Sequence, residues 1–199
     1  MDVGRWMFCL SSSPILCHKP SPMPSDSDLQ ILRSAIRDVV DFPKPGIVFK
    51  DITPVLADAK LFRLAIDCFA EATRAAGAEK VVGIDARGFL FGAAVAYQLG
   101  LGFVPIRKKG KLPYKTQSAA YTLEYGEAVV EMHVDAVQPG EKVVLIDDLL
   151  ATGGTAAAAI KLIELMGAKL VEAQFLIELD FLQGRVNLPA DRVRAFLHF

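Results

Sequence analysis

The feature that most constrains this chain is the segment Val143–Thr155, with the sequence VVLIDDLLATGGT. Its four leading apolar residues predict a buried parallel strand, and two carboxylates, Asp147 and Asp148, follow where that strand is expected to end. Small residues come next, and the apolar spacing over Ala156–Met166 predicts a helix. A strand, a glycine turn and a helix N-terminus together point several backbone N–H groups at one place. We therefore expect this segment to bind a phosphate group.

The signatures missing from this segment narrow the kind of phosphate ligand. It contains no Gly-x-x-x-x-Gly-Lys-[Ser/Thr] pattern, which disfavours a nucleoside triphosphatase, and no Gly-x-Gly-x-x-Gly dinucleotide pattern. Carboxylates repel a phosphate, but they accept hydrogen bonds from vicinal hydroxyl groups. A ribose 5-phosphate suits both halves of the segment, with its diol on Asp147 and Asp148 and its monophosphate on the loop that follows.

The segment resembles the phosphoribosyl-pyrophosphate (PRPP) motif of the type I phosphoribosyltransferases. The resemblance implies that Asp147 and Asp148 hold the 2′ and 3′ hydroxyls of the ribose. It also implies that the 5′-phosphate binds to the five residues of the loop, which are Ala151, Thr152, Gly153, Gly154 and Thr155. Without such a loop, an acidic pair at a strand end would more often be a helix cap or a solvated pair.

A second informative segment lies within an expected loop from Asp41 to Pro54. Taken alone, the apolar residues 47–49 would be a short core strand. The sequence Pro-Gly-Ile-Val-Phe-Lys-Asp-Ile nevertheless resembles the base-binding segment of the adenine phosphoribosyltransferases. That resemblance implies an aromatic ring that stacks on adenine. It also implies that main-chain groups of the residues before and after this aromatic residue contact the edge of the base. The implied adenine site consists of Val48, Phe49 (the stacking ring), Lys50 and Leu149.

A third segment is the turn after the expected strand Val81–Ile84. The turn has the sequence Asp-Ala-Arg-Gly and precedes an expected helix over Phe89–Leu99. On its own it would be an ordinary strand-to-helix connection. The family resemblance implies that this turn binds pyrophosphate through Arg87, and that a non-proline cis peptide joins Asp85 to Ala86.

A basic cluster, Arg107–Lys111, follows the expected strand Gly102–Ile106. A run of charges is usually a solvated turn. Here the cluster follows a buried strand, and a ligand that carries pyrophosphate needs cations beside it. We therefore expect Lys111 to contact the pyrophosphate together with Arg87, and the family resemblance adds Tyr125 to these contacts.

Residues Leu112–Ala120 show neither helical nor strand periodicity, which predicts a mobile loop. Tyr121–Gly126 and the alternation over Ala128–Val134 predict a hairpin at the base of that loop. Loops of this kind commonly close over active sites. In the family that the chain resembles, the matching glutamate is an acid–base partner of the purine ring, so the resemblance assigns catalysis to Glu124.

Composition limits the class of protein. A chain of 199 residues with 52% hydrophobic and 23% charged residues suits one domain with a sizeable core. A formal net charge of −1 provides no general attraction for nucleic acid. The cysteines Cys9, Cys17 and Cys68 show no metal-ligand spacing, which predicts a reduced intracellular protein, and we expect a cytoplasmic one. The apolar runs are too short to span a bilayer.

Residues Met1–Asp26 are rich in proline and serine and have only scattered apolar residues. We expect either a disordered extension or a start codon placed too early, with Met23 as the natural start. A transit peptide stays open as an alternative, because the segment is rich in serine and poor in acidic residues, although it has little arginine.

We predict a single α/β domain over residues 27–199, with an open parallel sheet flanked by helices. Strands are expected near Val81, Phe103, Val143 and Val171, with helices between them. The resemblance implies the type I phosphoribosyltransferase fold, with a small N-terminal hood and a flexible closing loop or hairpin. The first helix should begin with the capping pattern Ser27-x-x-Gln30 and carry Val39 on its apolar face.

The resemblance implies an enzyme of purine salvage that converts adenine and PRPP into AMP and pyrophosphate. It further implies Mg²⁺ bound to the substrate with no protein ligands, a homodimer, and neither a nucleic-acid nor a membrane partner. A phosphoribosyltransferase for a 6-oxopurine or orotate would share the central motif but lack the Phe49 and Glu124 segments. A non-enzymatic PRPP sensor that binds DNA would need a helix-turn-helix pattern or a basic half, and the sequence has neither.

Overall fold

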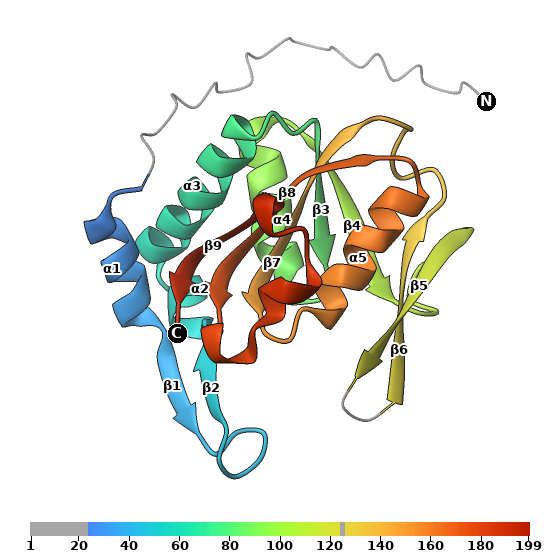
Figure 1. The fold of residues 1–199 in the computed structure, drawn as a ribbon. Helices are drawn as coiled ribbons and strands as arrows, with labels where there is room; N and C mark the ends of the chain where they lie inside the picture. Colours follow the sequence, from blue (N-terminus) through green and yellow to red (C-terminus); the bar gives the residue numbers. More distant parts are fainter. Residues whose placement is uncertain (1–23, 124–125) are drawn as a thin grey trace, which may run out of the picture.

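The computed structural model describes residues 24–123 and 126–199, but not the side chains of residues 122, 123, 126 and 127. Seven strands form one sheet in the order β5-β6-β4-β3-β7-β8-β9 (Figure 1). Strands β4, β3, β7, β8 and β9 are parallel, whereas β6 is antiparallel to β4 and to β5. The strands are β3 (Lys80–Ile84), β4 (Gly102–Lys108), β5 (Thr116–Leu123), β6 (Gly126–His133), β7 (Lys142–Leu150), β8 (Lys169–Glu178) and β9 (Val193–His198).

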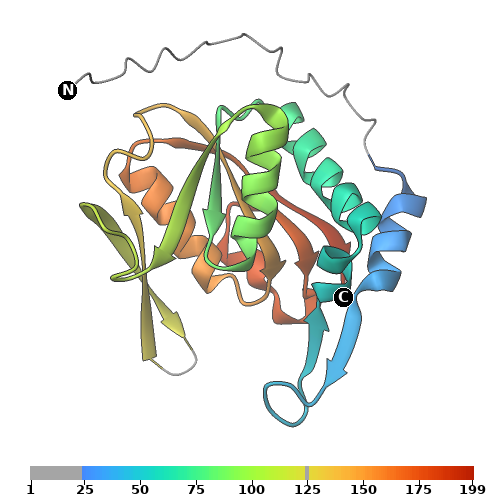
Figure 2. The same ribbon diagram turned by 180° about the vertical axis from the view of Figure 1, so that it is seen from behind.

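Helices cover both faces of the sheet. Helices α3 (Ala59–Ala75) and α4 (Arg87–Leu99) pack on one face, which Figure 2 shows from the front, and α5 (Gly154–Leu165) packs on the other. Helices α1 (Asp26–Ala35) and α2 (Thr53–Ala57) extend the layer of α3. Short 3₁₀ segments, η1 (Asp180–Leu182), η2 (Gly184–Asn187) and η3 (Ala190–Arg192), connect β8 to β9. The predicted α/β class with a mostly parallel, helix-flanked sheet is confirmed.

The central strand β7 is longer than its neighbour β3. The pairing of β3 with β7 ends where Gly83 lies opposite Ile146, but β8 accompanies β7 as far as Leu150. The predicted strand end at the acidic pair is therefore wrong, because β7 continues through Asp147 and Asp148 and only its β3 neighbour stops. The chain also reverses its direction of travel across the sheet between β3 and β7, and α/β proteins bind ligands at such points.

The N-terminal hood is a hairpin of β1 (Arg37–Val40) and β2 (Val48–Asp51), which pair antiparallel. The predicted first helix is wrong beyond residue 35, because residues 37–40 form β1. The predicted loop over residues 41–54 is wrong at residues 48–51, which form β2, and at residues 53–54, which begin α2. The turn between the strands contains a cis peptide before Pro43 and left-handed backbone at Asp41 (φ 59°) and Gly46 (φ 86°). The Gly46 N–H donates to Asp41 Oδ1 at 2.7 Å and closes the turn.

Ser25 is the N-cap of α1, so the predicted capping residue, Ser27, is wrong by two positions. The Asp28 N–H donates to Ser25 Oγ at 3.2 Å, and the Ser25 N–H donates to Asp28 Oδ2 at 2.9 Å. This is a capping box in which an aspartate replaces the expected glutamate or glutamine. Helix α1 and its cap therefore include Ser25 and Asp26, which we assigned to the extension.

The hairpin of β5 and β6 is longer than predicted. Strand β5 begins at Thr116, so the predicted loop over Leu112–Ala120 is wrong from that residue onward, and the hairpin itself is confirmed. Ala119 is 4% exposed and joins the core beneath α5. The small residues of this strand pack through their pairing with β6, and the periodicity of apolar residues along one segment does not predict such pairing. Figures 1 and 2 show this hairpin and the hood projecting at the same edge of the molecule, where the parallel strands end.

The remaining predicted elements agree with the structure to within three residues at each end. Helix α3 carries Cys68 on its buried face and ends before Gly77, which has left-handed backbone (φ 67°). Strand β9 lies beside β8 at one edge of the sheet. Within the described residues, no helix combines the length and the apolar content needed to cross a membrane.

Candidate active site

A cleft of about 300 Å³ opens at the carboxyl ends of β3 and β7. The end of β3, the turn into α4, the end of β7 and the loop into α5 surround it, and β4 and β5 each contribute one residue. The lining consists of Ile84, Asp85, Ala86, Arg87, Lys108, Tyr121 and residues 147–156. All seven residues predicted to bind the ribose 5-phosphate thus lie in one cleft, together with Arg87 and Leu149.

The loop after β7 leads directly into α5. Gly153 occupies the N-cap position with left-handed backbone (φ 82°), which a glycine adopts without strain. A glycine has no side chain with which to cap the helix, so the N–H groups in the first turn of α5 stay available to an external acceptor. The helix dipole adds to the attraction for an anion at this end.

The acidic pair sits on the part of β7 that has lost its β3 neighbour. The Asp148 N–H donates to Asp147 Oδ1 at 2.9 Å, and Asp148 itself is 3% exposed. Burial raises the pKa of the Asp147 carboxyl well above its ordinary value, and the charge of Asp148 adds to the increase. Burial also raises the pKa of Asp148, against the opposing effect of the Arg87 guanidinium. The two carboxyls therefore resist carrying two full charges in the free protein.

Arg87 is the first residue of α4, and its Nε lies 2.9 Å from Asp148 Oδ2. The next residue, Gly88, allows α4 to touch β7, because a Cβ at this position would lie 2.7 Å from the carbonyl oxygen of Ile146. The peptide between Asp85 and Ala86 is cis, as the family resemblance predicted. The turn after β3 and the acidic pair thus form one continuous wall of the cleft.

Arg107 is a residue of this site that the sequence analysis missed. Its Nε donates to Asp85 Oδ2 at 2.9 Å, and its Nη1 donates to the Lys111 carbonyl at 3.1 Å. It therefore links the two segments predicted to bind pyrophosphate. The Lys111 side chain does not line the cleft in this structure, whereas Lys108 does. Composition identified the basic cluster, but it could not tell which of its members lines the cleft.

The hood brings its aromatic residue to the edge of the cleft. The Phe49 ring centroid lies 5.6 Å from the Arg87 guanidinium carbon, although neither Phe49, Val48 nor Lys50 lines the cleft itself. The Lys50 amino group lies 2.6 Å from Asp38 Oδ1 and stacks over the Phe199 ring. The Lys50 side chain is thus held away from the cleft.

Two predicted site residues, Glu124 and Tyr125, lie outside the described residues. The strand that leads to them, β5, contributes Tyr121 to the lining of the cleft. The hairpin therefore stands beside the site. Tyr121 was also missed by the sequence analysis, where it appeared only as the start of a hairpin.

Comparison with known proteins identifies the family. Residues 56–192 match the family described as Phosphoribosyl transferase domain. The adenine phosphoribosyltransferase of Acidothermus cellulolyticus is 54% identical over 175 residues, which cover 88% of this chain and 99% of the relative. The crystal structure of the Rhodothermus marinus adenine phosphoribosyltransferase has a TM-score of 0.83 at 52% identity, covering 88% of this chain and 100% of that one.

A structure with bound ligands also matches. The Saccharomyces cerevisiae adenine phosphoribosyltransferase, in complex with D-2,5-dideoxy-2,5-imino-altritol 1,6-bisphosphate and adenine, has a TM-score of 0.83 at 42% identity. The match covers 86% of this chain and 99% of the yeast chain. The fold, the arrangement of the cleft and these similarities agree, and the chain belongs to the adenine phosphoribosyltransferase family.

Proposed function

We infer that this protein transfers the 5-phosphoribosyl group of PRPP to adenine and so produces AMP and pyrophosphate, a step of purine salvage. The observation that carries this inference is one cleft with a recognition element for each part of PRPP. Two carboxylates suit a ribose diol, an uncapped helix N-terminus suits a monophosphate, and Arg87 suits a pyrophosphate. In the reaction the bond from C1′ to a pyrophosphate oxygen breaks, adenine N9 bonds to C1′, and the purine loses one proton.

We propose that Asp147 and Asp148 accept hydrogen bonds from the ribose hydroxyls, and that the loop residues 151–155 bind the 5′-phosphate. A diol donates hydrogen bonds, and ionised carboxylates are strong acceptors for them. As the C1′ bond breaks, the sugar develops positive charge like that of a glycosidase transition state. Carboxylates held close to that charge stabilise it.

We propose that Arg87, Lys111 and Tyr125 bind the departing pyrophosphate, and that Mg²⁺ arrives with PRPP. The described carboxyls of the cleft are already engaged: Asp85 with Arg107, Asp148 with Arg87, and Asp147 with a backbone N–H. This arrangement suits an ion held by substrate oxygens and water, as Mg²⁺ commonly is. When bound, Mg²⁺ supplies charge neutralisation to the leaving pyrophosphate.

We propose that adenine binds between the hood and the cleft. The Phe49 ring would stack on the base, and main-chain groups of Val48 and Lys50 would contact its edge, with Leu149 beside it. The position of Phe49 next to Arg87 supports this, because it brings base and pyrophosphate subsites together. Glu124 is the proposed acid–base partner of the purine ring.

The test of the function is AMP formation from PRPP with adenine, hypoxanthine and guanine offered side by side. We expect product with adenine only, and comparable product with hypoxanthine or guanine would assign the protein to 6-oxopurines. A chain that forms no product but shifts genomic DNA fragments in a gel would be a PRPP-responsive regulator. We also propose a cytoplasmic homodimer, which sedimentation velocity and fractionation can test.

A further inference from the structure

We propose that Gly184, Arg185 and Asn187 are positioning residues that hold the loop Ala151–Thr155 in its phosphate-binding shape. All three belong to η2, between β8 and β9. Among the described residues that line the cleft, none comes from η2, so these residues act on the ligand only through the loop. The inference rests on the proposed function, since that function makes the loop the site of the 5′-phosphate. We refer to the three residues as the loop clamp.

The closest part of the loop clamp is a direct contact between two stretches of backbone. A Cβ built on Gly184 would lie 2.0 Å from the carbonyl oxygen of Ala151, and one built on Gly153 would lie 2.3 Å from the carbonyl oxygen of Gly184. Real atoms do not approach so closely, so neither position can hold a side chain without displacing the other segment. Gly153 is also the N-cap of α5, and Gly184 therefore rests on the residue that begins the anion-binding turn.

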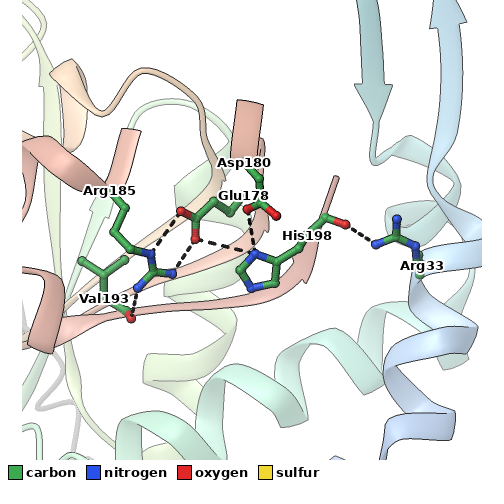
Figure 3. A network of polar contacts seen from close by, with 6 residues as sticks. All are labelled: Arg33, Glu178, Asp180, Arg185, Val193 and His198. Atoms are coloured by element: carbon green, nitrogen blue, oxygen red, sulfur yellow. Dashed lines mark hydrogen bonds and ion pairs between the residues drawn. The ribbon is translucent and has the colours of Figure 1, made fainter. Parts of the chain in front are cut away.

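Arg185 anchors this contact to the sheet. Its Nε donates to Glu178 Oε1 at 3.1 Å, its Nη2 pairs with Glu178 Oε2, and its Nη1 donates to the Val193 carbonyl at 2.7 Å (Figure 3). Glu178 is 5% exposed and stands at the end of β8, opposite Leu150. A guanidinium that binds both oxygens of a buried carboxylate has one preferred orientation. The ion pair thus fixes η2 next to the point where β7 becomes the loop.

Asn187 completes the loop clamp from the other side. Its Nδ2 donates to the Thr152 carbonyl at 2.9 Å. A loop carbonyl that is held in this way cannot turn toward the cleft, where it would repel a phosphate. The Leu179 N–H also donates to the Leu150 carbonyl at 3.0 Å, so the residue before the loop is joined to the residue before η1.

The loop requires such support because its own sequence provides little. Consecutive glycines at 153 and 154 are conformationally free, and the N-cap glycine has no side chain to cap the helix. A loop that must be ordered by its ligand binds that ligand less tightly than a loop that is already ordered. The loop clamp orders the loop before PRPP binds, so PRPP binding does not have to supply the free energy of ordering it.

The Glu178 carboxylate, which binds Arg185, also lies close to Asp180 and His198, and these three side chains could together hold a metal ion. Both Glu178 oxygens already accept from Arg185, and the His198 Nδ1 lies 2.9 Å from Asp180 Oδ1. These pairings account for the group without an ion. We therefore assign Glu178 to anchoring η2.

The test compares AMP, which has a 5′-phosphate, with adenine, which has none. Arg185→Ala should raise the Kd of AMP and the KM of PRPP on the order of tenfold, because small displacements of binding groups are costly. The Kd of adenine should change less than about twofold, as expected for a site with no shared partner. Arg185→Lys, which keeps the charge but not the fork, should recover part of the loss. Calorimetry and steady-state kinetics give these values.

Arg194→Ala is the matched control. Arg194 on β9 pairs with Glu172 on β8 at 3.0 Å, the same strand that carries Glu178. Its side chain is 39% exposed, against 32% for Arg185, but none of its described polar contacts reaches the loop. It should leave the Kd of AMP unchanged. Equal losses for AMP and adenine in Arg185→Ala, no loss for AMP, or the same response from Arg194→Ala would overturn the proposal.

Two further variants keep the Arg185–Glu178 pair and decide the question if Arg185→Ala does not fold. Gly184→Ala places a methyl group against the Ala151 carbonyl, and Asn187→Ala removes an exposed side chain. Both should weaken AMP more than adenine, Asn187→Ala by about threefold, the size of one net hydrogen bond. A parent chain that forms no AMP refutes the proposed function itself. An active parent whose variants keep their affinity for AMP refutes only the loop clamp.

Discussion

The guanidinium of Arg87 lies 2.9 Å from the carboxylate of Asp148. This pair joins the proposed pyrophosphate and ribose subsites, which lie at the ends of the two neighbouring strands β3 and β7. Arg87 begins α4, on the proposed pyrophosphate side of the cleft, while Asp148 is on β7, on the proposed ribose side. In the free protein, each group therefore neutralises the other. A ligand that carries both a pyrophosphate and a diol can replace these contacts on both sides.

Arg87→Ala should lower kcat/KM for PRPP about a hundredfold, the usual loss when one charged donor to a developing anion is removed. The Kd of adenine should stay close to the parental value. Arg74→Ala serves as the control, because Arg74 pairs with Glu71 on the surface of α3. If kcat/KM for PRPP fell by less than about threefold, Arg87 would have no part in pyrophosphate binding.

Asp147→Asn should stabilise the fold at neutral pH while it weakens PRPP binding. Because burial and Asp148 raise the pKa of Asp147, the folded protein holds this proton more tightly than the unfolded chain does. The resulting cost to stability is absent below the unfolded pKa and complete above the folded one. The gain in Tm should therefore be largest near about pH 8 and shrink towards about pH 4.

Thermal unfolding across this pH range measures the effect, and Asp58→Asn provides a control of opposite sign. Backbone N–H groups of Leu61 and Lys60 lower the pKa of the Asp58 carboxyl, so its charge stabilises the fold at neutral pH. The two variants should thus move Tm in opposite directions at about pH 8. A gain for Asp147→Asn that grows towards acid would contradict the assignment.

Glu124 is expected to exchange a proton or hydrogen bond with the purine ring when the hairpin closes and excludes water. Desolvation favours the neutral carboxylic acid, which can donate to purine N7. Glu124→Leu should lose about a hundredfold or more in kcat, the low end for general acid–base catalysis, whereas Glu124→Gln keeps a donor and part of the rate. Steady-state kinetics of folded variants decide this, and near-parental turnover of Glu124→Leu would remove the residue from the mechanism.

Phe49→Ala should raise the KM of adenine about tenfold, since stacking a base on an aromatic ring contributes roughly 1–3 kcal/mol. Phe49→Tyr keeps the ring and should stay close to the parent. Phe181→Ala is the control, because Phe181 on η1 is 71% exposed and belongs to no proposed subsite. Equal effects of Phe49→Ala on adenine and PRPP would speak against stacking.

A chain that starts at Met23 should keep the melting temperature and activity of the full sequence. Residues before the start lack a periodic apolar face that could be buried, and the first described helix is capped by Ser25. Differential scanning calorimetry and the AMP assay on both chains test this. A drop of several degrees in Tm would show that the removed residues pack on the domain.

The strand, loop and helix around the acidic pair could be predicted because local sequence specifies them. Strand β7 is followed by the small residues 151–155, which include two glycines, and then by the apolar spacing of α5. The hood could not be predicted in this way. Leu32 and Val39 keep helical spacing, yet Val39 pairs with Phe49 across a hairpin, and spacing along one segment carries no information about a partner strand.

The inner geometry of the site also depended on the topology. Arg87 meets Asp148 because β3 and β7 are neighbours in the sheet, although helix α4 and three strands (β4, β5 and β6) lie between them along the chain. Gly184 and Asn187 gave no signal at all, since glycine and asparagine are ordinary turn residues. Their importance becomes visible only where two backbones come into contact.

The unequal lengths of β3 and β7 have a consequence for hydrogen exchange. Up to Ile146, β7 has a strand on each side, and from Asp147 to Leu150 its one partner among the described strands is β8. Amide protection should therefore step down within this one strand, at the acidic pair. A ligand that occupies the open side should slow exchange at residues 147–150 more than in the rest of the sheet, which makes these amides a direct reporter of cleft occupancy.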